Sequence, residues 1–237
     1  MACNSGQDQK TVEDISIVID QIHVENHAPD STVVFSALES KMISANLLDV
    51  QWLNADIIVD LKYSTTDNFL NQKIYEGLSN AYLEEKTAKM LAVAQYRLSQ
   101  TNPGYKLKIW DAARPVSCQQ LMWNVLKMPA GEKGRFVSNP KNHSLHNYGC
   151  AVDLTIVNDD STELDMGTKF DQFDSLAQPK YEMYLLSQGR LSKQQIQNRN
   201  LLRSTLIAAG FRTISSEWWH FNGCSREYAK SQYRLVE

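Results

Sequence analysis

Short apolar segments of two kinds follow one another along the chain. Residues 55–63 (Ala-Asp-Ile-Ile-Val-Asp-Leu-Lys-Tyr) and residues 105–109 (Tyr-Lys-Leu-Lys-Ile) interleave apolar and charged positions, a pattern typical of half-buried strands. Residues 151–157 (Ala-Val-Asp-Leu-Thr-Ile-Val) are mostly apolar and predict a buried strand. We expect residues 211–221 to form a final strand or turn.

Helical spacing marks the segments between these strands. Residues 83–100 repeat leucine and alanine along one helical face, and the Asn-Pro-Gly that follows ends this helix. Ser192 and Gln195 form the capping box of a second helix, which ends at Gly210. A shorter helix is expected over residues 117–127, where a serine can cap the first turn.

The order of these elements favours an α+β domain. Strands and helices mix without the regular alternation of a doubly wound sheet and without an internal repeat. The 237 residues, of which 43% are apolar, can fill one large core. Because residues 1–48 are mixed in character, we interpret them as an N-terminal extension and residues 49–237 as a single domain.

Charge and composition argue against two classes of protein. The net charge of −3, from 24 basic and 27 acidic residues, does not fit the phosphate-neutralising surface that nucleic-acid binding needs. No stretch approaches the roughly 18 uninterrupted apolar residues that can cross a bilayer, and the first residues do not form the apolar region of a signal peptide. We therefore expect a soluble protein that does not bind nucleic acid.

The four cysteines are spread along the chain without a C-x-x-C pair, so neither a compact zinc knuckle nor a thioredoxin-like motif is available. Cys118, Cys150 and Cys224 are expected to be buried free thiols. Cys3 precedes a polar stretch, as at the start of a bacterial lipoprotein, and predicts a lipid anchor in the cell envelope, on the periplasmic side. An ordinary cysteine near the terminus of a cytoplasmic protein is the alternative.

One histidine and one aspartate stand out as candidate metal ligands. His146 lies in a loop seven positions before Asp153, which belongs to the predicted buried strand. A carboxylate there is costly unless a cation or several donors compensate for it, and a metal ion does so directly. Three of the five histidines, His23, His27 and His143, are interpreted as non-ligands, although His143 is near enough to His146 to compete with it.

A histidine near the C-terminus completes the candidate site. Glu217 precedes His220 by three positions in Glu-Trp-Trp-His. Two imidazoles and one carboxylate leave the fourth tetrahedral position of zinc open for water, as in catalytic sites. Zinc lowers the pKa of such a water to about 7, so that a neighbouring glutamate can take its proton. This combination predicts one zinc ion per chain, held by His146, Asp153 and His220, with Glu217 as the catalytic base.

Several segments carry a resemblance to a known family. The S-x-H-x-x-G-x-A-x-D string from Ser144 to Asp153, with the Glu-Trp-Trp-His string, resembles the D-alanyl-D-alanine dipeptidases, zinc peptidases related to the zinc D,D-carboxypeptidases. Further segments resemble the family in the same order: Asp60 to Tyr63 with Asp67 to Phe69, Trp110 and Asp111 with Arg114 and Pro115, and Met166 and Gly167 with Phe170 and Asp171. The resemblance implies a single zinc-peptidase domain, with helices packed on a central, mostly antiparallel sheet.

The resemblance also implies roles for four more residues. Arg114 is expected to stabilise the oxyanion that develops on the scissile carbonyl, a task that suits a fixed guanidinium. Asp171 and Tyr63 are expected to hold the free amino terminus of a dipeptide, and Ser144 to contact the substrate near the metal. Without the resemblance, Arg114 would be interpreted as a turn residue in a surface ion pair, and Ser144 as a cap of the backbone.

The function implied by the resemblance is hydrolysis of a small D-amino-acid dipeptide, D-Ala-D-Ala. Two alternatives remain open: a zinc D,D-carboxypeptidase that acts on peptidoglycan stem peptides, and a non-catalytic peptidoglycan-binding module. The presence of both Glu217 and Arg114 weighs against the binding module, because binding alone needs neither. No oligomeric state is predicted.

Overall fold

The computed structural model describes residues 34–237, which contain two β-sheets. The larger has the strand order β2-β4-β5-β7-β6, and the smaller pairs β1 with β3. The strands are β1 (Leu48–Asp49), β2 (Ile58–Val59), β3 (Tyr82–Leu83), β4 (Lys106–Asp111), β5 (Ala151–Val157), β6 (Arg212–Thr213) and β7 (His220–Asn222). In the larger sheet β2 runs parallel to β4, and the other neighbouring pairs are antiparallel. The predicted α+β fold with a mostly antiparallel central sheet is therefore confirmed, with one parallel edge.

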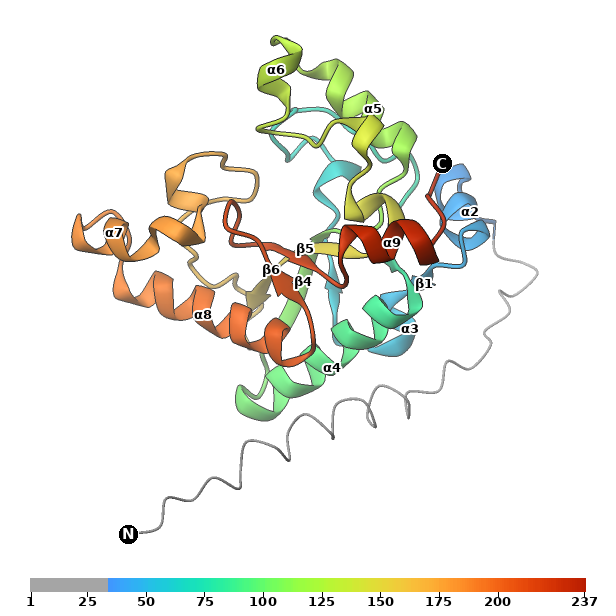
Figure 1. Cartoon of the computed structure of the whole chain (residues 1–237). Helices are drawn as coiled ribbons and strands as arrows, with labels where there is room; N and C mark the ends of the chain where they lie inside the picture. Colours follow the sequence, from blue (N-terminus) through green and yellow to red (C-terminus); the bar gives the residue numbers. More distant parts are fainter. Residues whose placement is uncertain (1–33) are drawn as a thin grey trace.

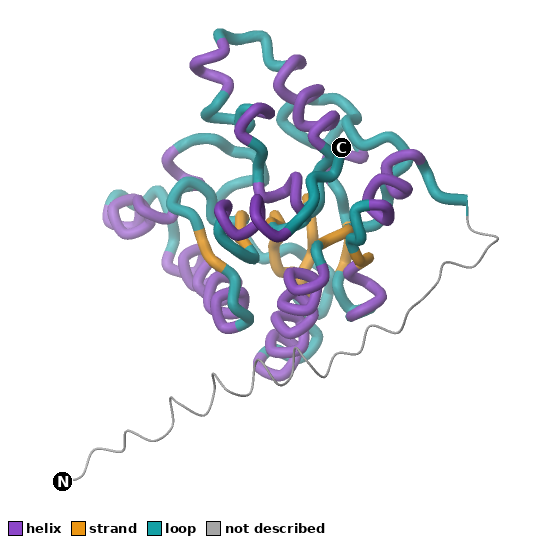
Figure 2. The backbone as a smooth tube through the Cα atoms, turned by 45° about the vertical axis from the view of Figure 1, so that its right-hand side comes forward, coloured by secondary structure: helices purple, strands orange, loops and turns teal. Residues whose placement is uncertain are grey.

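Helices surround the larger sheet. The α-helices are α2 (Ala37–Ser44), α3 (Val50–Leu53), α4 (Glu85–Thr101), α5 (Val116–Val125), α6 (Ala130–Lys133), α7 (Glu182–Ser187), α8 (Lys193–Ala208) and α9 (Arg226–Gln232). Five 3-10 helices lie in the described residues: η1 (Lys62–Ser64), η2 (Pro140–Asn142), η3 (Leu145–Tyr148), η4 (Ser175–Ala177) and η5 (Pro179–Tyr181). Figure 1 shows α4 and α8 side by side along one side of the sheet, with α5 and α6 on the opposite side. The strands occupy the middle of the molecule, enclosed by helices and long loops (Figure 2).

The sequence of β5 explains its central place in the sheet. Every residue of this strand is buried. Val152, Leu154 and Ile156 alternate onto one face and join the main hydrophobic core. Asp153 and Thr155 project to the opposite face, because successive side chains of a strand point to opposite sides. The one carboxylate of the strand is thereby separated from its aliphatic face.

Most predicted elements lie close to their expected bounds. The strand expected over residues 151–157 coincides with β5, and the capping box of Ser192 and Gln195 opens α8. The strand expected over residues 55–63 is confirmed only at Ile58–Val59, since a turn precedes β2 and η1 follows it. At the start of η1, Lys62 forms ion pairs with Asp60 at 3.1 Å and with Asp67 at 2.8 Å.

The N-terminal extension falls largely outside the described residues. The lipid anchor predicted on Cys3, and His23 and His27, all lie in that part. Within the described part, α2 buries Met42 completely in the core. The boundary at residue 48 stays a prediction. Between residues 34 and 237, the structure has no helix that is long and apolar enough to cross a membrane.

Candidate active site

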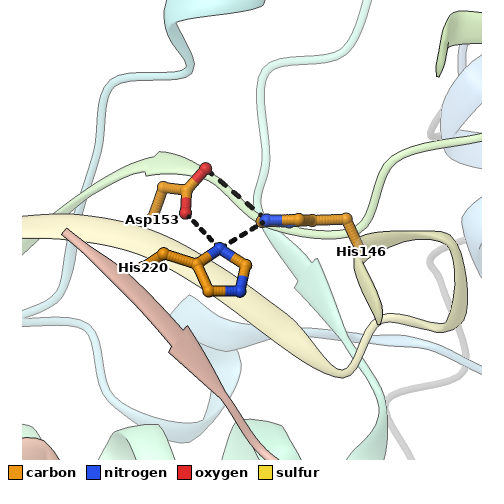
Figure 3. Close-up of side chains that lie close together, drawn as sticks. All are labelled: His146, Asp153 and His220. Carbon is orange, nitrogen blue, oxygen red and sulfur yellow. Dashed lines mark hydrogen bonds and ion pairs between the residues drawn. The ribbon is translucent and has the colours of Figure 1, made fainter. Parts of the chain in front are cut away.

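Three side chains from separate segments converge on the larger sheet. Asp153 on β5 pairs directly with His220 on β7, and His146 comes from η3, just before β5. The Nδ1 atom of His220 lies 2.9 Å from Oδ1 of Asp153. The Nε2 atom of His146 lies 3.5 Å from Oδ2 of Asp153 and 3.3 Å from Nδ1 of His220. Figure 3 shows the three groups pointing toward one another, and one potential ligand atom of each lies within 4.8 Å of the others.

The outer nitrogen of each imidazole ring is held by an oxygen. Nδ1 of His146 donates to the carbonyl oxygen of Ala112 over 2.6 Å, and Nε2 of His220 donates to Oδ1 of Asn222 over 2.8 Å. In the neutral form of each ring the hydrogen therefore lies on the outer nitrogen, and the inner nitrogen can bind a cation in place of a proton. This arrangement is typical of metal-binding histidines, whose second nitrogen is oriented by a neighbouring acceptor.

Local sequence chemistry fixes the turn that carries His146. The Ser144 hydroxyl accepts from the backbone nitrogen of His146 at 3.2 Å, and Asn147 completes a capping box. Gly149 ends η3 in the left-handed region at φ 66°, where a side chain is disfavoured. A Cβ atom on Gly149 would also lie 2.8 Å from the backbone nitrogen of Glu84. The serine predicted to contact substrate is thus a backbone cap, and it also lines the cavity described below.

Burial and charge act in opposite directions on the ligands. Burial alone would raise the pKa of Asp153, but His146 and His220 outweigh burial and lower this pKa. Burial would lower the pKa of His220, but its hydrogen bond with Asp153 raises the pKa to about 9. Positive charge is therefore what keeps the buried carboxylate ionised. A metal cation supplies such charge, and two nitrogens with one carboxylate oxygen are the donors of catalytic zinc sites.

The predicted base lies in the loop before β7 and lines the same cavity as the three ligands. Burial raises the pKa of Glu217, an effect that Asp153 increases and that the positive charge of His220 opposes. A carboxyl group with a raised pKa can both accept a proton and return it near neutral pH. Glu217 therefore lies in the same cavity as the candidate metal ligands, with a raised pKa.

Arg114 is buried in an ion pair, not exposed in a turn. Its Nε donates to Oδ2 of Asp111 over 3.1 Å, and its Nη2 donates to the same oxygen. Oδ1 of Asp111 accepts from the Tyr75 hydroxyl at 2.7 Å and from the backbone of Ala112 at 3.0 Å. Burial would lower the pKa of Arg114, but Asp111 raises it well above its usual value. The guanidinium is therefore fixed and charged, with its plane 5.4 Å from the Tyr63 ring centroid.

Tyr63 and Asp171 meet although 108 positions separate them. The Tyr63 hydroxyl donates to Oδ2 of Asp171 over 2.9 Å. Asp171 has a positive φ of 57°, which turns its carboxyl group toward this partner. Burial raises the pKa of Asp171 well above its usual value, although the hydrogen bond from Tyr63 opposes this rise. A ligand ammonium group would favour the ionised form of this carboxyl.

All eight predicted site residues line one cavity of about 650 Å³: Tyr63, Arg114, Ser144, His146, Asp153, Asp171, Glu217 and His220. The competing candidate His143 does not join the ligand set within the described residues. Its ring makes an edge contact with Tyr148 at 6.5 Å.

Two supporting residues received no role from the sequence. Asp111 stands opposite Asp153 in the sheet register and anchors Arg114. Asn222 follows His220 by two positions on the same strand, so both side chains point to one face. The His-x-Asn spacing on a strand is a signal that could have identified Asn222. Asp111 lies three residues before Arg114, and that spacing alone did not distinguish it from a loop acid.

Comparisons with known proteins identify the family of the chain. The family model described as D-Ala-D-Ala dipeptidase matches residues 43–236. A D-alanyl-D-alanine dipeptidase of Escherichia coli (strain K12) is 30% identical over 181 residues, which cover 75% of this chain and 84% of the relative. One of Enterococcus faecium is 30% identical over 191 residues, covering 73% and 89%, and one of Enterococcus faecalis is 28% identical over 191 residues, covering 75% and 91%.

The family match extends over nearly all the described residues and includes every residue of the cavity named above. It begins within α2 and ends one residue before the C-terminus. The chain is an enzyme of the metallopeptidase class and belongs to the D-Ala-D-Ala dipeptidase family.

Proposed function

We propose that the chain hydrolyses the dipeptide D-Ala-D-Ala with one zinc ion held by His146, Asp153 and His220. The observation that carries this proposal is the convergence of these ligands with Glu217 and Arg114 in one cavity. Two imidazoles and one carboxylate are a donor set of catalytic zinc, since they leave a position open. The names of the family and of its relatives supply the dipeptide.

The proposed reaction divides the chemistry between the ion and the protein. When bound, zinc supplies Lewis acidity, which polarises the scissile carbonyl and lowers the pKa of water at the open position. Glu217 takes a proton from the attacking water on a carboxylate oxygen and returns it to the nitrogen of the leaving D-alanine. The raised pKa of Glu217 lowers the free-energy cost of holding that proton between the two steps.

Arg114 stabilises the negative charge that develops on the carbonyl oxygen. Asp111 holds the guanidinium in place before substrate arrives, so little reorganisation is needed during the reaction. Tyr63 and Asp171 bind the ammonium group of the dipeptide, which favours the ionised form of Asp171. A substrate without a free amino terminus would leave this buried carboxylate with the Tyr63 hydrogen bond but without a cationic partner, which is costly.

A metal analysis combined with a D-Ala-D-Ala assay tests the proposal. Zinc-loaded protein should bind one zinc ion per chain and release D-alanine from the free dipeptide, but not from the N-acetylated dipeptide. Cleavage of the blocked peptide alone would select the D,D-carboxypeptidase alternative. Zinc binding without cleavage of either would select the binding module.

A Glu217→Ala variant tests the role of the base. It should keep its zinc, because Glu217 is not in the ligand set, and lose at least about a hundredfold in turnover. Equal loss of zinc would contradict this role.

We also propose that the native protein is anchored in the cell envelope through a lipid on Cys3. The polar stretch that follows this cysteine supports the proposal. Expression with the native upstream sequence, followed by fractionation and mass spectrometry of the N-terminal peptide, tests it. A soluble, unlipidated product would favour the cytoplasmic alternative.

A further inference from the structure

Two cysteines flank the strands that carry the candidate metal ligands. Cys150 immediately precedes β5, and Cys224 follows the last residue of β7 by two positions. The backbone nitrogen of Gly223 donates to the carbonyl oxygen of Cys150 over 2.8 Å, which continues the pairing of the two strands. Paired residues on antiparallel strands have Cα atoms about 4.5–5.5 Å apart. Cys224 is one step beyond the position opposite Cys150, and the chain bends there after β7 has ended, so that both side chains reach the same cluster.

The side chains of these cysteines occupy the same small apolar cluster. Tyr148, Cys150 and Ala229 form its buried part, and Cys224 packs against them. Cys150 is completely buried. Cys224 is half-buried and also lines the active-site cavity. One thiol of the pair is therefore reachable through the cavity, and the other is shielded behind it.

The two thiols belong to one cluster and shift each other's pKa in opposite directions. The neighbouring Cys224 thiol, together with burial, raises the pKa of Cys150. The neighbouring Cys150 thiol and the positive charges of Arg212 and Lys86 lower the pKa of Cys224, and they outweigh burial and Glu84, which act in the other direction. The accessible thiol is thus the more acidic one. Thiolates, not thiols, are the nucleophiles of disulfide exchange.

We propose that Cys150 and Cys224 form a reversible disulfide in which Cys224 reacts first. With a low-molecular-weight disulfide such as oxidised glutathione, the Cys224 thiolate attacks one sulfur, forms a mixed disulfide and releases one glutathione thiolate. The Cys150 thiol then attacks the Cys224 sulfur, and its proton passes to the second glutathione that leaves. In sum, two protein thiols are oxidised to one disulfide, and one glutathione disulfide is reduced to two glutathione molecules.

This disulfide would covalently join the ends of β5 and β7, the two strands that carry Asp153 and His220. Asp153 and His220 both lie inside the loop that the disulfide closes, three and four residues from its ends. Closing so long a loop restricts the unfolded chain and should raise the melting temperature by roughly 5–15 °C. The inference does not depend on the proposed substrate, because it concerns only thiols and thermal stability.

The first test uses the full chain, reduced and then incubated with oxidised glutathione. Non-reducing peptide mapping by mass spectrometry should identify a peptide that joins Cys150 to Cys224, and the melting temperature should rise until a reductant is added. Cys118→Ser is the matched control, since Cys118 is buried elsewhere with its sulfur 3.8 Å from the Ile74 carbonyl oxygen. The control should behave as wild type. Absence of the joined peptide, or an unchanged melting temperature after it forms, would overturn the proposal.

A second test assigns the order of the reaction. Cys150→Ser should retain glutathione on Cys224, which lines the cavity and is therefore accessible. In Cys224→Ser, Cys150 should stay unmodified because it is buried. If either variant does not fold, acid-quenched wild type sampled early should carry glutathione on Cys224. Glutathione on Cys150 in any of these samples would refute the proposed order.

Discussion

Replacing Asp111 by asparagine tests how the buried charge of Arg114 is held. Asp111 is completely buried, and Oδ2 is the carboxylate oxygen that accepts both guanidinium hydrogen bonds. Its other oxygen accepts from Tyr75 and from the backbone of Ala112. Asparagine keeps the size of the side chain and one acceptor oxygen but removes the negative charge. The guanidinium would then be buried without a counter-ion at that position.

The burial of Arg114 sets the expected loss in the free energy of unfolding. Removing one partner of a buried ion pair costs about 3–5 kcal/mol, because the remaining charge is no longer compensated. In a chain of this size, each kcal/mol shifts the melting temperature by roughly 2–4 °C, so Asp111→Asn should melt roughly 6–20 °C lower. If Arg114 stabilises the oxyanion as proposed, its displacement should also lower kcat by about 10²–10³.

Urea unfolding of the metal-free protein measures the free energy of unfolding without a contribution from ion binding. Asp60→Asn is the matched control, because Asp60 pairs at 3.1 Å with Lys62 and at 2.8 Å with Lys108 but is one-third exposed. Partly exposed pairs contribute about 0–1 kcal/mol, so the control should unfold nearly as wild type. Similar free-energy losses for the two variants would refute the argument from burial.

Three further substitutions test other parts of the site. Asn222→Ala removes the acceptor of the outer His220 nitrogen and should weaken zinc binding about 10–100-fold, as measured by competition with a chelator. Unchanged zinc affinity would show that this hydrogen bond does not orient the ring. Asp171→Asn should raise KM for D-Ala-D-Ala about 10–100-fold with a smaller effect on kcat, because the variant loses the proposed contact with the ammonium group of the dipeptide. A change in kcat alone would contradict a role of Asp171 in binding that group. Gly149→Ala should lower the free energy of unfolding by about 1–3 kcal/mol, because φ is positive and Cβ would press on the Glu84 backbone; an unchanged denaturation midpoint would show that the turn relaxes freely.

The cluster of candidate metal ligands could be predicted because Asp153 conflicts with its local surroundings. An aspartate in the middle of an apolar strand is costly, so the position of Asp153 already called for a cation. The structure brings His146 and His220 to that carboxylate. The two long helices were also predicted, α4 from its periodic apolar face and α8 from the capping box that opens it.

Short secondary-structure elements and contacts between distant residues could not be predicted from the pattern of apolar and polar residues. β1 and β3 have two residues each, too few to show any alternation. Tyr63 was expected in a strand, but it lies in η1. The contact between Tyr63 and Asp171 joins two loops across the fold, and only the family resemblance indicated it. Local periodicity carries no information about such pairs.

The register between β5 and β7 has a consequence for biosynthesis. Asp153 and His220 meet only when the last strand docks in the correct register, and a slip of one residue would turn one of the two side chains to the opposite face. Since the chain is made from its N-terminus, the ligand set stays incomplete until nearly all of the protein has been synthesised. An ion that binds only the correctly paired sheet stabilises it by mass action. Binding of the proposed zinc ion should therefore favour molecules in which β7 has docked in the correct register.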